Sequence, residues 1–253
     1  MKTTTGKTST VRRTLTALAA SSLLLAGTAA APAAFADPSG PSAEESLAAQ
    51  RAIEGIEPTD AASVIDGIEA ANKVLDQLGI APFTPTLGFC TDVSFSPAIG
   101  GAIPGPKTPG VGDLSLGDID LNAVKKGEVM FGFVPVGVIN DSAGKGGMQV
   151  AWFNVNTFKG SLGDPMGGIT DVILDAVQKR ISQTFPLPGA DVGAQALVNS
   201  TLKPALNSIP QAGVRGALVD TDAGTVLAAM YGTVKKGNDT CFYFPSMGIV
   251  TVS

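Results

Sequence analysis

The stretch from Glu128 to Lys159 decides the expected fold, because it holds the two most strand-like segments of the chain. Residues 128–139 read EVMFGFVPVGVI, residues 148–159 read MQVAWFNVNTFK, and the polar sequence NDSAGKGG runs between them. Turn residues between two β-branched and aromatic runs are typical of a β-hairpin. Apolar residues occupy both alternating sets of positions in these runs. We therefore expect a central hairpin that is covered on both faces.

Further segments have strand character. A first strand is predicted at Leu87–Phe95, and the C-terminal part predicts a three-stranded meander at Val214–Val219, Val226–Val234 and Cys241–Val252. Residues 96–112 hold four prolines and five glycines, so we expect an irregular loop there.

Helical periodicity appears in four segments. Residues 43–54 predict a short helix, residues 59–78 a clear amphipathic helix, and residues 165–185 and 191–204 two more helices after the central hairpin. The expected apolar face of the amphipathic helix consists of Val64, Ile65, Ile68, Ala71, Leu75 and Leu78.

Together these elements predict an α+β fold. It has a mainly antiparallel sheet of five or six strands, helices inserted between strands three and four, and an N-terminal helix pair. We expect a signal peptide at residues 1–36, a linker with a short helix at 37–58, and a single α+β domain at 59–253.

The first 36 residues have the layout of a secretory signal peptide. Four basic residues between Lys2 and Arg13 precede an apolar run at 15–30, and Ala34-Phe35-Ala36 forms a small-x-small cleavage site. The apolar run is short and rich in alanine, which favours a cleaved signal over a membrane anchor. We expect a secreted, extracellular or cell-envelope-associated protein whose mature chain has no transmembrane helix.

The charge of the expected mature chain argues against nucleic acid as a partner. The full chain has 17 Lys and Arg against 22 Asp and Glu, and loss of the four basic residues of the leader leaves 13 against 22, a net charge near −9. Binding to phosphate backbones needs a concentrated basic surface. An acidic chain suits a soluble exported protein instead. The oligomeric state is not indicated by the sequence.

The two cysteines, Cys90 and Cys241, predict one disulfide. An even pair in an exported chain is most simply an oxidised bridge, which here would tie the first strand to the last. Two cysteines without histidine are too few ligands for a zinc site.

The absence of histidine removes most familiar catalytic arrangements. Neither a Ser-His-Asp triad nor a Cys-His pair can form. Ser142 and Lys145 match the S-x-x-K spacing of Ser/Lys acyl enzymes, but they lie in the expected polar turn, where the lysine is solvated. We expect no catalytic residue and no cofactor.

A calcium loop is suggested by spacing alone. Asp118, Asp120 and Asn122 have the D-x-D-x-N order with which such loops begin, yet Ala123 and Val129 occupy the positions that need glycine and a carboxylate. We therefore expect an exposed alternating segment and no metal ion.

A carboxylate-dependent hydrolase is one alternative function. Such an enzyme needs two paired carboxyl groups. The candidates are Asp113, Asp118, Asp120, Glu128, Asp220 and Asp222. Their spacing selects no pair.

The leading functional hypothesis is a non-enzymatic protein that binds an apolar, lipid-like ligand or a protein partner. Strands that are apolar on both faces need two covers, and a ligand or partner could supply one. The candidate ligand-binding residues are Phe131, Phe133, Trp152, Phe153, Tyr231, Phe242, Tyr243 and Phe244. Lysines at 125, 126, 145, 235 and 236 could form a rim that meets anionic head groups. The other alternative is a structural or pore-forming subunit of the outer envelope.

The signal peptide, the composition rich in Ala, Gly, Asp and Val, the lack of histidine and the single cysteine pair give the chain a recognisable layout. In this layout it resembles small exported envelope proteins of high-GC Gram-positive actinobacteria, including the mycolate-bearing group. The resemblance implies a location in the cell envelope and, as one possible partner, a lipid or another envelope component. It covers layout and composition and assigns no functional residue.

Overall fold

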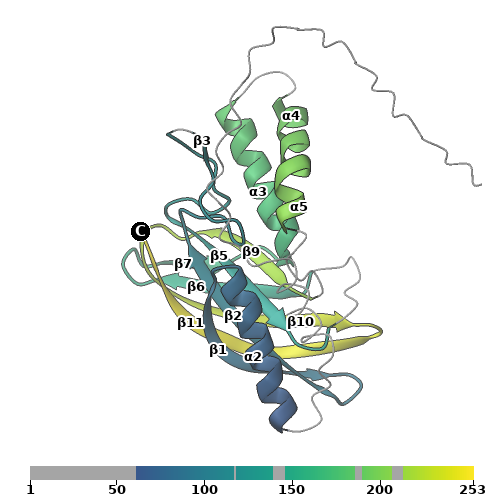
Figure 1. Cartoon of the computed structure of the whole chain (residues 1–253). Helices are drawn as coiled ribbons and strands as arrows, with labels where there is room; N and C mark the ends of the chain where they lie inside the picture. Colours follow the sequence, from purple (N-terminus) through teal and green to yellow (C-terminus); the bar gives the residue numbers. More distant parts are fainter. Residues whose placement is uncertain (1–60, 117, 139–145, 186–189, 207–212) are drawn as a thin grey trace, which may run out of the picture. The chain divides into compact units, whose positions relative to one another are not determined.

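The computed structural model describes residues 61–116, 118–138, 146–185, 190–206 and 213–253, all within one compact unit, Ala34–Ser253 (Figure 1). The described residues are mostly β. Nine of their strands form one antiparallel sheet that curls into a half-barrel. The expected signal peptide, linker and first N-terminal helix lie outside the described residues.

The sheet has the strand order β7-β6-β10-β11-β1-β2-β5-β9-β8. In chain order its strands are β1 Ala81–Cys90, β2 Phe95–Pro104, β5 Glu128–Pro135, β6 Met148–Asn154, β7 Lys159–Leu162, β8 Gly167–Gly168, β9 Arg215–Asp220, β10 Gly224–Lys236 and β11 Asp239–Val252. A separate hairpin consists of β3 Ser115–Leu116 and β4 Ile119–Asp120. The helices are α2 Ala61–Gln77, α3 Ile169–Thr184, α4 Ala190–Leu197, the π-helix η1 Val198–Leu202 and α5 Lys203–Leu206.

The predicted α+β class with five or six strands is therefore wrong. One reason is that the Gly- and Pro-rich stretch forms β2, a strand buried along most of its length. Its glycines lie where neighbouring atoms approach too closely for a side chain. A Cβ on Gly101 would lie 2.5 Å from the carbonyl oxygen of Ala81, and one on Gly100 would overlap the methyl group of Met230.

The prediction of a central hairpin is also wrong, because β5 and β6 are not neighbours in the sheet. β5 pairs with β2 and β9, whereas β6 pairs with β10 and β7. β5 is buried on both faces, as expected, but β6 is buried on one face only. Most of the connecting sequence, residues 139–145, lies outside the described residues.

The predicted C-terminal meander holds for two of its three strands. β10 and β11 form a long antiparallel hairpin. β9 instead pairs with β5 and β8, on the other side of the sheet. The chain between β7 and β8 follows β6 through two bonds, from the Gly163 amide to the Val150 carbonyl and from the Met166 amide to the Met148 carbonyl. Residues 159–168 thereby link the two edges of the sheet.

The side chains that point into the curl fill it. They form a core of buried residues that includes Phe83, Phe131, Phe133, Met148, Val150, Met166, Met230 and Tyr243. This packing leaves the interior occupied by the chain itself.

A second core lies on the outer side of β2, β5 and β9, under helices. Figure 1 shows α2 alongside β1 and β2, and α3 next to α4. α3 also packs against β9. Leu75 of α2, Leu78 just after it, and Ile169 and Ile173 of α3 are buried in this second core. Outward residues of the strands such as Met130 lie there as well. The helices therefore cover one part of the outer side of the sheet.

The amphipathic helix predicted at 59–78 is present as α2. Its buried side includes Ala71 and Leu75, and Leu78 just after the helix is buried too, whereas the predicted Ile65 is exposed. Gly79 ends the helix with a φ of 68°, a left-handed conformation that favours glycine.

The predicted disulfide between Cys90 and Cys241 is confirmed. The two residues are register partners on β1 and β11, and both are fully buried. The bridge joins neighbouring strands that are 151 residues apart in sequence. It is consistent with an oxidising environment.

We expect the disulfide to contribute much of the stability. Replacing both cysteines with alanine should lower the free energy of unfolding by about 2–5 kcal/mol, because the bridge restricts the unfolded chain across a long loop. Urea unfolding followed by circular dichroism measures this change. The double variant should be insensitive to reductant. Equal unfolding free energies for the oxidised wild type and the variant would contradict the expectation.

The glycines of β2 give a second prediction. Gly101→Ala should lower the free energy of unfolding by about 1–3 kcal/mol, because its new methyl group meets backbone at Ala81. Gly193→Ala in α4 is the control, since a Cβ there meets nothing within 4 Å. That control should be neutral or stabilise by up to about 1 kcal/mol through helix propensity. Equal effects in urea unfolding would show that the close approach at Gly101 is unimportant.

Candidate binding surface

The outer side of β6, β10 and β11 carries exposed apolar side chains. Along β10 the inward residues Val226, Ala228 and Met230 are buried, while Leu227 between them is exposed. This is the alternation of a strand with a core on one side. What is unusual is that several outward positions, on this strand and its neighbours, carry apolar side chains as well.

β11 keeps its large apolar residues outward through a bulge. Met230 pairs with Ser246 and Gly232 pairs with Tyr243, so Tyr231 on β10 faces two residues of β11, Phe244 and Pro245. The extra residue changes which positions of β11 point outward. It also accommodates a proline, which cannot donate to the ladder.

We define the apolar face as the large exposed apolar side chains on this outer side. They are Phe89 of β1, Phe95 of β2, Phe153 of β6, Phe158 after β6, Leu162 of β7, Leu227 of β10, and Phe242, Phe244, Met247 and Ile249 of β11.

The strand register arranges part of the apolar face as a ridge and a groove. Phe153, Leu227 and Ile249 lie side by side on β6, β10 and β11, and we call this row the ridge. The next outward row lies two residues further along each strand. Its middle positions are the small residues Ala151 and Ala229, which form a floor between the taller side chains. Leu162 and Met247 stand at the two ends of that row.

The floor of small residues produces a groove of about 610 Å³. Its lining is Thr84, Ala151, Trp152, Phe153, Leu227, Ala228, Ala229, Met247, Gly248 and Ile249. The backbone of these strands is engaged in sheet hydrogen bonds. A partner would therefore meet side chains almost alone, so apolar contact governs what this groove can hold.

A ladder of three phenylalanines continues the apolar face toward the disulfide. Phe89 pairs in register with Phe95 on one side and with Phe242 on the other. The rings of Phe89 and Phe95 meet edge to face, with centroids 5.4 Å apart. All three side chains are exposed, so this packing leaves much of their surface in water.

The eight predicted ligand-binding residues separate into two groups. Phe131, Phe133 and Tyr243 are buried in the interior core, and Trp152 is half-buried against it. Phe153, Phe242 and Phe244 belong to the apolar face, and Tyr231 lies half-buried on the same outer side. Sequence reasoning missed the aliphatic members such as Leu227 and Ile249, because residues on both sides of β10 are apolar near Leu227 and the bulge in β11 shifts the alternation before Ile249.

The buried Tyr243 belongs to a polar cluster inside the curl. Ser96 donates to the Val136 carbonyl at 2.7 Å, so its oxygen accepts from the Tyr243 hydroxyl at 2.6 Å. Arg215 is nearby and only 1 % exposed, and burial lowers the pKa of Arg215 to about 10. Gly88 makes room for this arrangement, because a Cβ there would lie 2.6 Å from the tyrosine ring. The cluster fixes Tyr243 as part of the core.

Burial also raises the pKa of Tyr243 well above its ordinary value of 10.0, with the Ser96 hydrogen bond and Arg215 opposing the shift. An acid with a raised folded pKa favours folding while the phenol is protonated, and this advantage is lost as pH rises above about 10. In a Tyr231→Phe variant, where Tyr243 is the sole tyrosine, we expect tyrosinate absorbance to rise only together with loss of the circular-dichroism signal. Ionisation near pH 10 in an intact fold would contradict this expectation.

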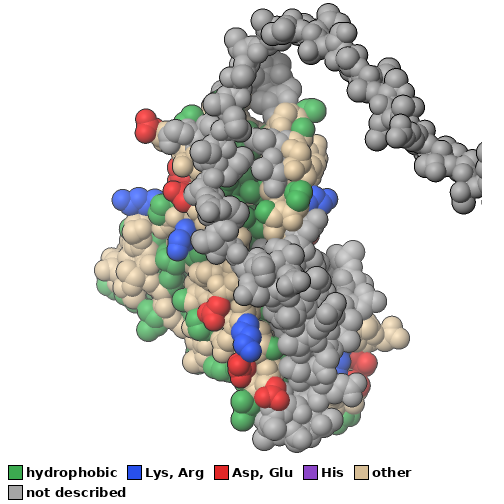
Figure 2. Space-filling view, in the orientation of Figure 1, with side chains coloured by type: hydrophobic (Ala, Val, Ile, Leu, Met, Phe, Trp, Pro, Cys, Tyr) green, Lys and Arg blue, Asp and Glu red, His purple; other side chains and the backbone are tan. Residues whose placement is uncertain are grey.

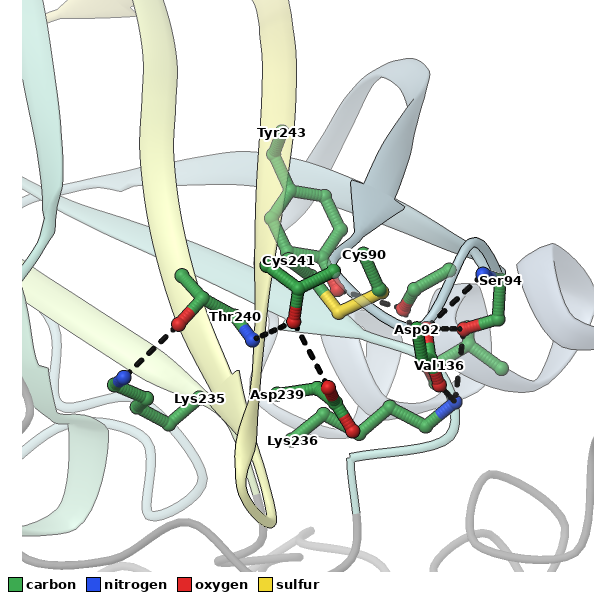
Figure 3. The surroundings of a disulfide bond; sticks show 12 residues. Cys90, Asp92, Ser94, Val136, Lys235, Lys236, Asp239, Thr240, Cys241 and Tyr243 are labelled. Atoms are coloured by element: carbon green, nitrogen blue, oxygen red, sulfur yellow. Dashed lines mark hydrogen bonds and ion pairs between the residues drawn. A yellow bond between two sulfur atoms is a disulfide. The ribbon is translucent and has the colours of Figure 1, made fainter.

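The end of the sheet at the disulfide is held by short polar contacts (Figure 3). The Thr91 hydroxyl donates to Asp239 at 2.8 Å, and Lys236 lies 4.0 Å from Asp92. Hydrogen bonds from Ser94 hold the pKa of Asp92 below its ordinary value. These contacts join the β1–β2 turn to the β10–β11 turn.

The lysines expected to form one rim lie at opposite ends of β11. Lys236 pairs in register with Asp239 at the start of β11. Lys125 and Lys126 precede Gly127, whose amide donates to the carbonyl of Ser253 after its end. Figure 2 shows Lys, Arg, Asp and Glu side chains scattered over the visible side, some of the basic groups beside acidic ones. Lys145 lies outside the described residues.

The acidic residues considered for catalysis or calcium mostly serve local structure. Asn122 is buried, and its side-chain amide donates to Asp113 at 2.7 Å, while its backbone N–H donates to Asp120. Glu128 pairs with Arg180 of α3, at 2.7 Å for one oxygen, and Asp222 pairs with Lys159 at 2.6 Å. Among the described residues no cluster of acidic or cysteine side chains could hold a metal ion. Ser142 lies outside them.

No protein-family model matches the chain, no curated protein matches its sequence, and no solved structure matches its fold. Within the described part of the chain, no helix has the length and apolar character needed to cross a bilayer.

Proposed function

We propose that this chain is an exported, non-enzymatic protein that binds an apolar partner through the apolar face. The observation that carries the proposal is the ridge beside its groove. Both are made by outward residues of three neighbouring strands, and both are open to solvent.

The size of the apolar face supports a binding role. From the exposed fractions and typical side-chain areas, its ten side chains expose on the order of 1,000 Å². The largest apolar patch on an ordinary monomer is about 300–600 Å². At roughly 25 cal/mol per Å², burying even half of this surface contributes enough free energy to offset much of the cost of association.

The outer side suits a partner better than the interior does. A ligand inside the curl would have to displace buried residues such as Phe131, Phe133 and Met230. Cores packed in this way resist added volume. On the outer side the groove already has space and needs no rearrangement of the core.

The expected export signal and the disulfide are compatible with a role outside the cytoplasm or in the cell envelope. In that setting an exposed apolar face can meet other envelope components.

Binding of the apolar dye ANS to the monomer tests the proposal. In the double variant Leu227→Thr with Ile249→Thr, we expect bound dye to fall by about half or more, because two of the three ridge residues lose apolar area. Threonine suits a strand, so the sheet should be kept. Dye titration at concentrations where the protein is monomeric measures the change.

The matched control is Ile65→Thr on α2. Ile65 is 64 % exposed and Ile249 is 67 % exposed. The change to threonine at Ile65 therefore removes about as much exposed apolar surface as the change at Ile249. The control should bind as much dye as the wild type. If the ridge variant binds the dye as well as the control does, the apolar face is not a binding surface and the proposed function fails.

A further inference from the structure

We propose that the partner is a second copy of this chain, docked face to face as a two-fold dimer in which each ridge enters the groove of the other copy. This inference rests on the proposed function, because it names the occupant of the same apolar face.

The first argument is that the ridge and the groove are adjacent and run in the same direction. Leu227 of the ridge and Ala229 of the groove are two residues apart on β10, and Phe153 and Ala151 have the same spacing on β6. Two residues of strand correspond to about 6.6 Å. The ridge and the alanine floor of the groove are therefore offset by one fixed interval along the strands.

The second argument is symmetry. A two-fold axis that lies between the two sheets, parallel to the rows and midway between them, exchanges the positions of ridge and groove. Leu227 then lies over the partner's Ala229, and Phe153 lies over the partner's Ala151. Ile249 meets the partner's Met247, which stands at the end of the groove. The same contacts form twice, which is the property of an isologous interface. Sheets that pack face to face lie about 10 Å apart with nearly aligned strands, which fits this arrangement.

The third argument distinguishes a second copy from an acyl chain. An acyl chain lying in the groove would cover Ala151 and Ala229 but would touch the ridge residues only on the sides that line the groove. A second copy covers the groove and the ridge together. Ile249 is the most exposed residue of the ridge, at 67 %, so covering the ridge is a large part of the gain.

The available area matches a modest dimer. The ridge with Phe158, Leu162, Phe244 and Met247 exposes on the order of 700 Å² per copy. A standard stable interface buries about 800 Å² per partner. The outward residues of β10 from Thr225 to Thr233 are uncharged, so salt should weaken association little. We therefore expect a dimer that dissociates on dilution.

Sedimentation equilibrium of the mature chain, from low micromolar to submillimolar concentration, tests the proposal. The wild type should pass from monomer to dimer as concentration rises. Ala229→Leu fills the groove and should weaken the dimer about tenfold or more, because the overlap with Leu227 occurs twice. The same change adds apolar area, so it should not lower ANS binding to the monomer. Ile65→Thr is the control and should dimerise as the wild type does.

The decisive experiment mixes two variants that exchange the sizes of ridge and groove. Leu227→Ala removes the ridge residue at the position that faces Ala229, so this variant should also dimerise poorly by itself. In a mixture with Ala229→Leu, the heterodimer has two different contacts between positions 227 and 229. In one contact the native Leu227 lies over the native Ala229. In the other, the alanine at position 227 lies over the leucine at position 229. The mixture should therefore dimerise more strongly than either variant alone. Circular dichroism of each variant confirms that it is folded.

Three results would overturn the dimer. They are a wild type that stays monomeric throughout, a wild-type dimer that neither variant weakens, and a mixture that dimerises no better than its components. In each case ANS binding that still depends on Leu227 and Ile249 would leave the proposed function in place. If ANS binding does not depend on Leu227 and Ile249, the dimer and the proposed function are both contradicted.

Discussion

Covering the outer side of the curled sheet is the constraint on which the rest of this structure depends. The interior is filled by residues of the strands themselves, such as Phe131 and Met230. The outer side cannot be closed in this way, because its side chains point away from one another. Over β2, β5 and β9 the cover is supplied by α2 and α3, whose leucines and isoleucines complete a second core. Over β6, β10 and β11 the outward residues are also apolar, yet they remain exposed. The same physical requirement is therefore met on one part of the sheet and left open on another.

Sequence patterns located many elements but not their neighbours. Strand character in β5, β6, β10 and β11, the α2 helix and the cysteine pair could all be predicted, because periodicity and composition report on local environment. Pairing is decided by packing between distant segments, so the turn-like sequence at 140–147 suggested a hairpin that does not exist. The glycines of β2 misled in a similar way. Glycine in a sequence signals freedom, whereas Gly101 is needed for close contact with the backbone at Ala81.

The candidate surface was predictable only in part, for a related reason. Aromatic residues are enriched both in cores and at binding surfaces, so composition could not separate Phe131 from Phe153. Their side of the sheet depends on register, and a shift of one residue would exchange the two sides. The bulge at Phe244 and Pro245 makes such a shift within β11. Without the structure, nothing fixes the sides on which Met247 and Ile249 lie.

The same contacts that hold the core also fix the geometry of the apolar face. Tyr243 points inward to Ser96, and its neighbours in sequence, Phe242 and Phe244, are thereby turned outward. Beyond the bulge, buried Ser246 donates to the Thr84 carbonyl and accepts from the Gly100 amide, which sets the outward direction of the residues that follow it. The backbone of paired strands is already ordered, so it loses little freedom when a partner covers its side chains. An interface built here would therefore spend little of its apolar free energy on ordering the backbone, and even a modest area could support specific association.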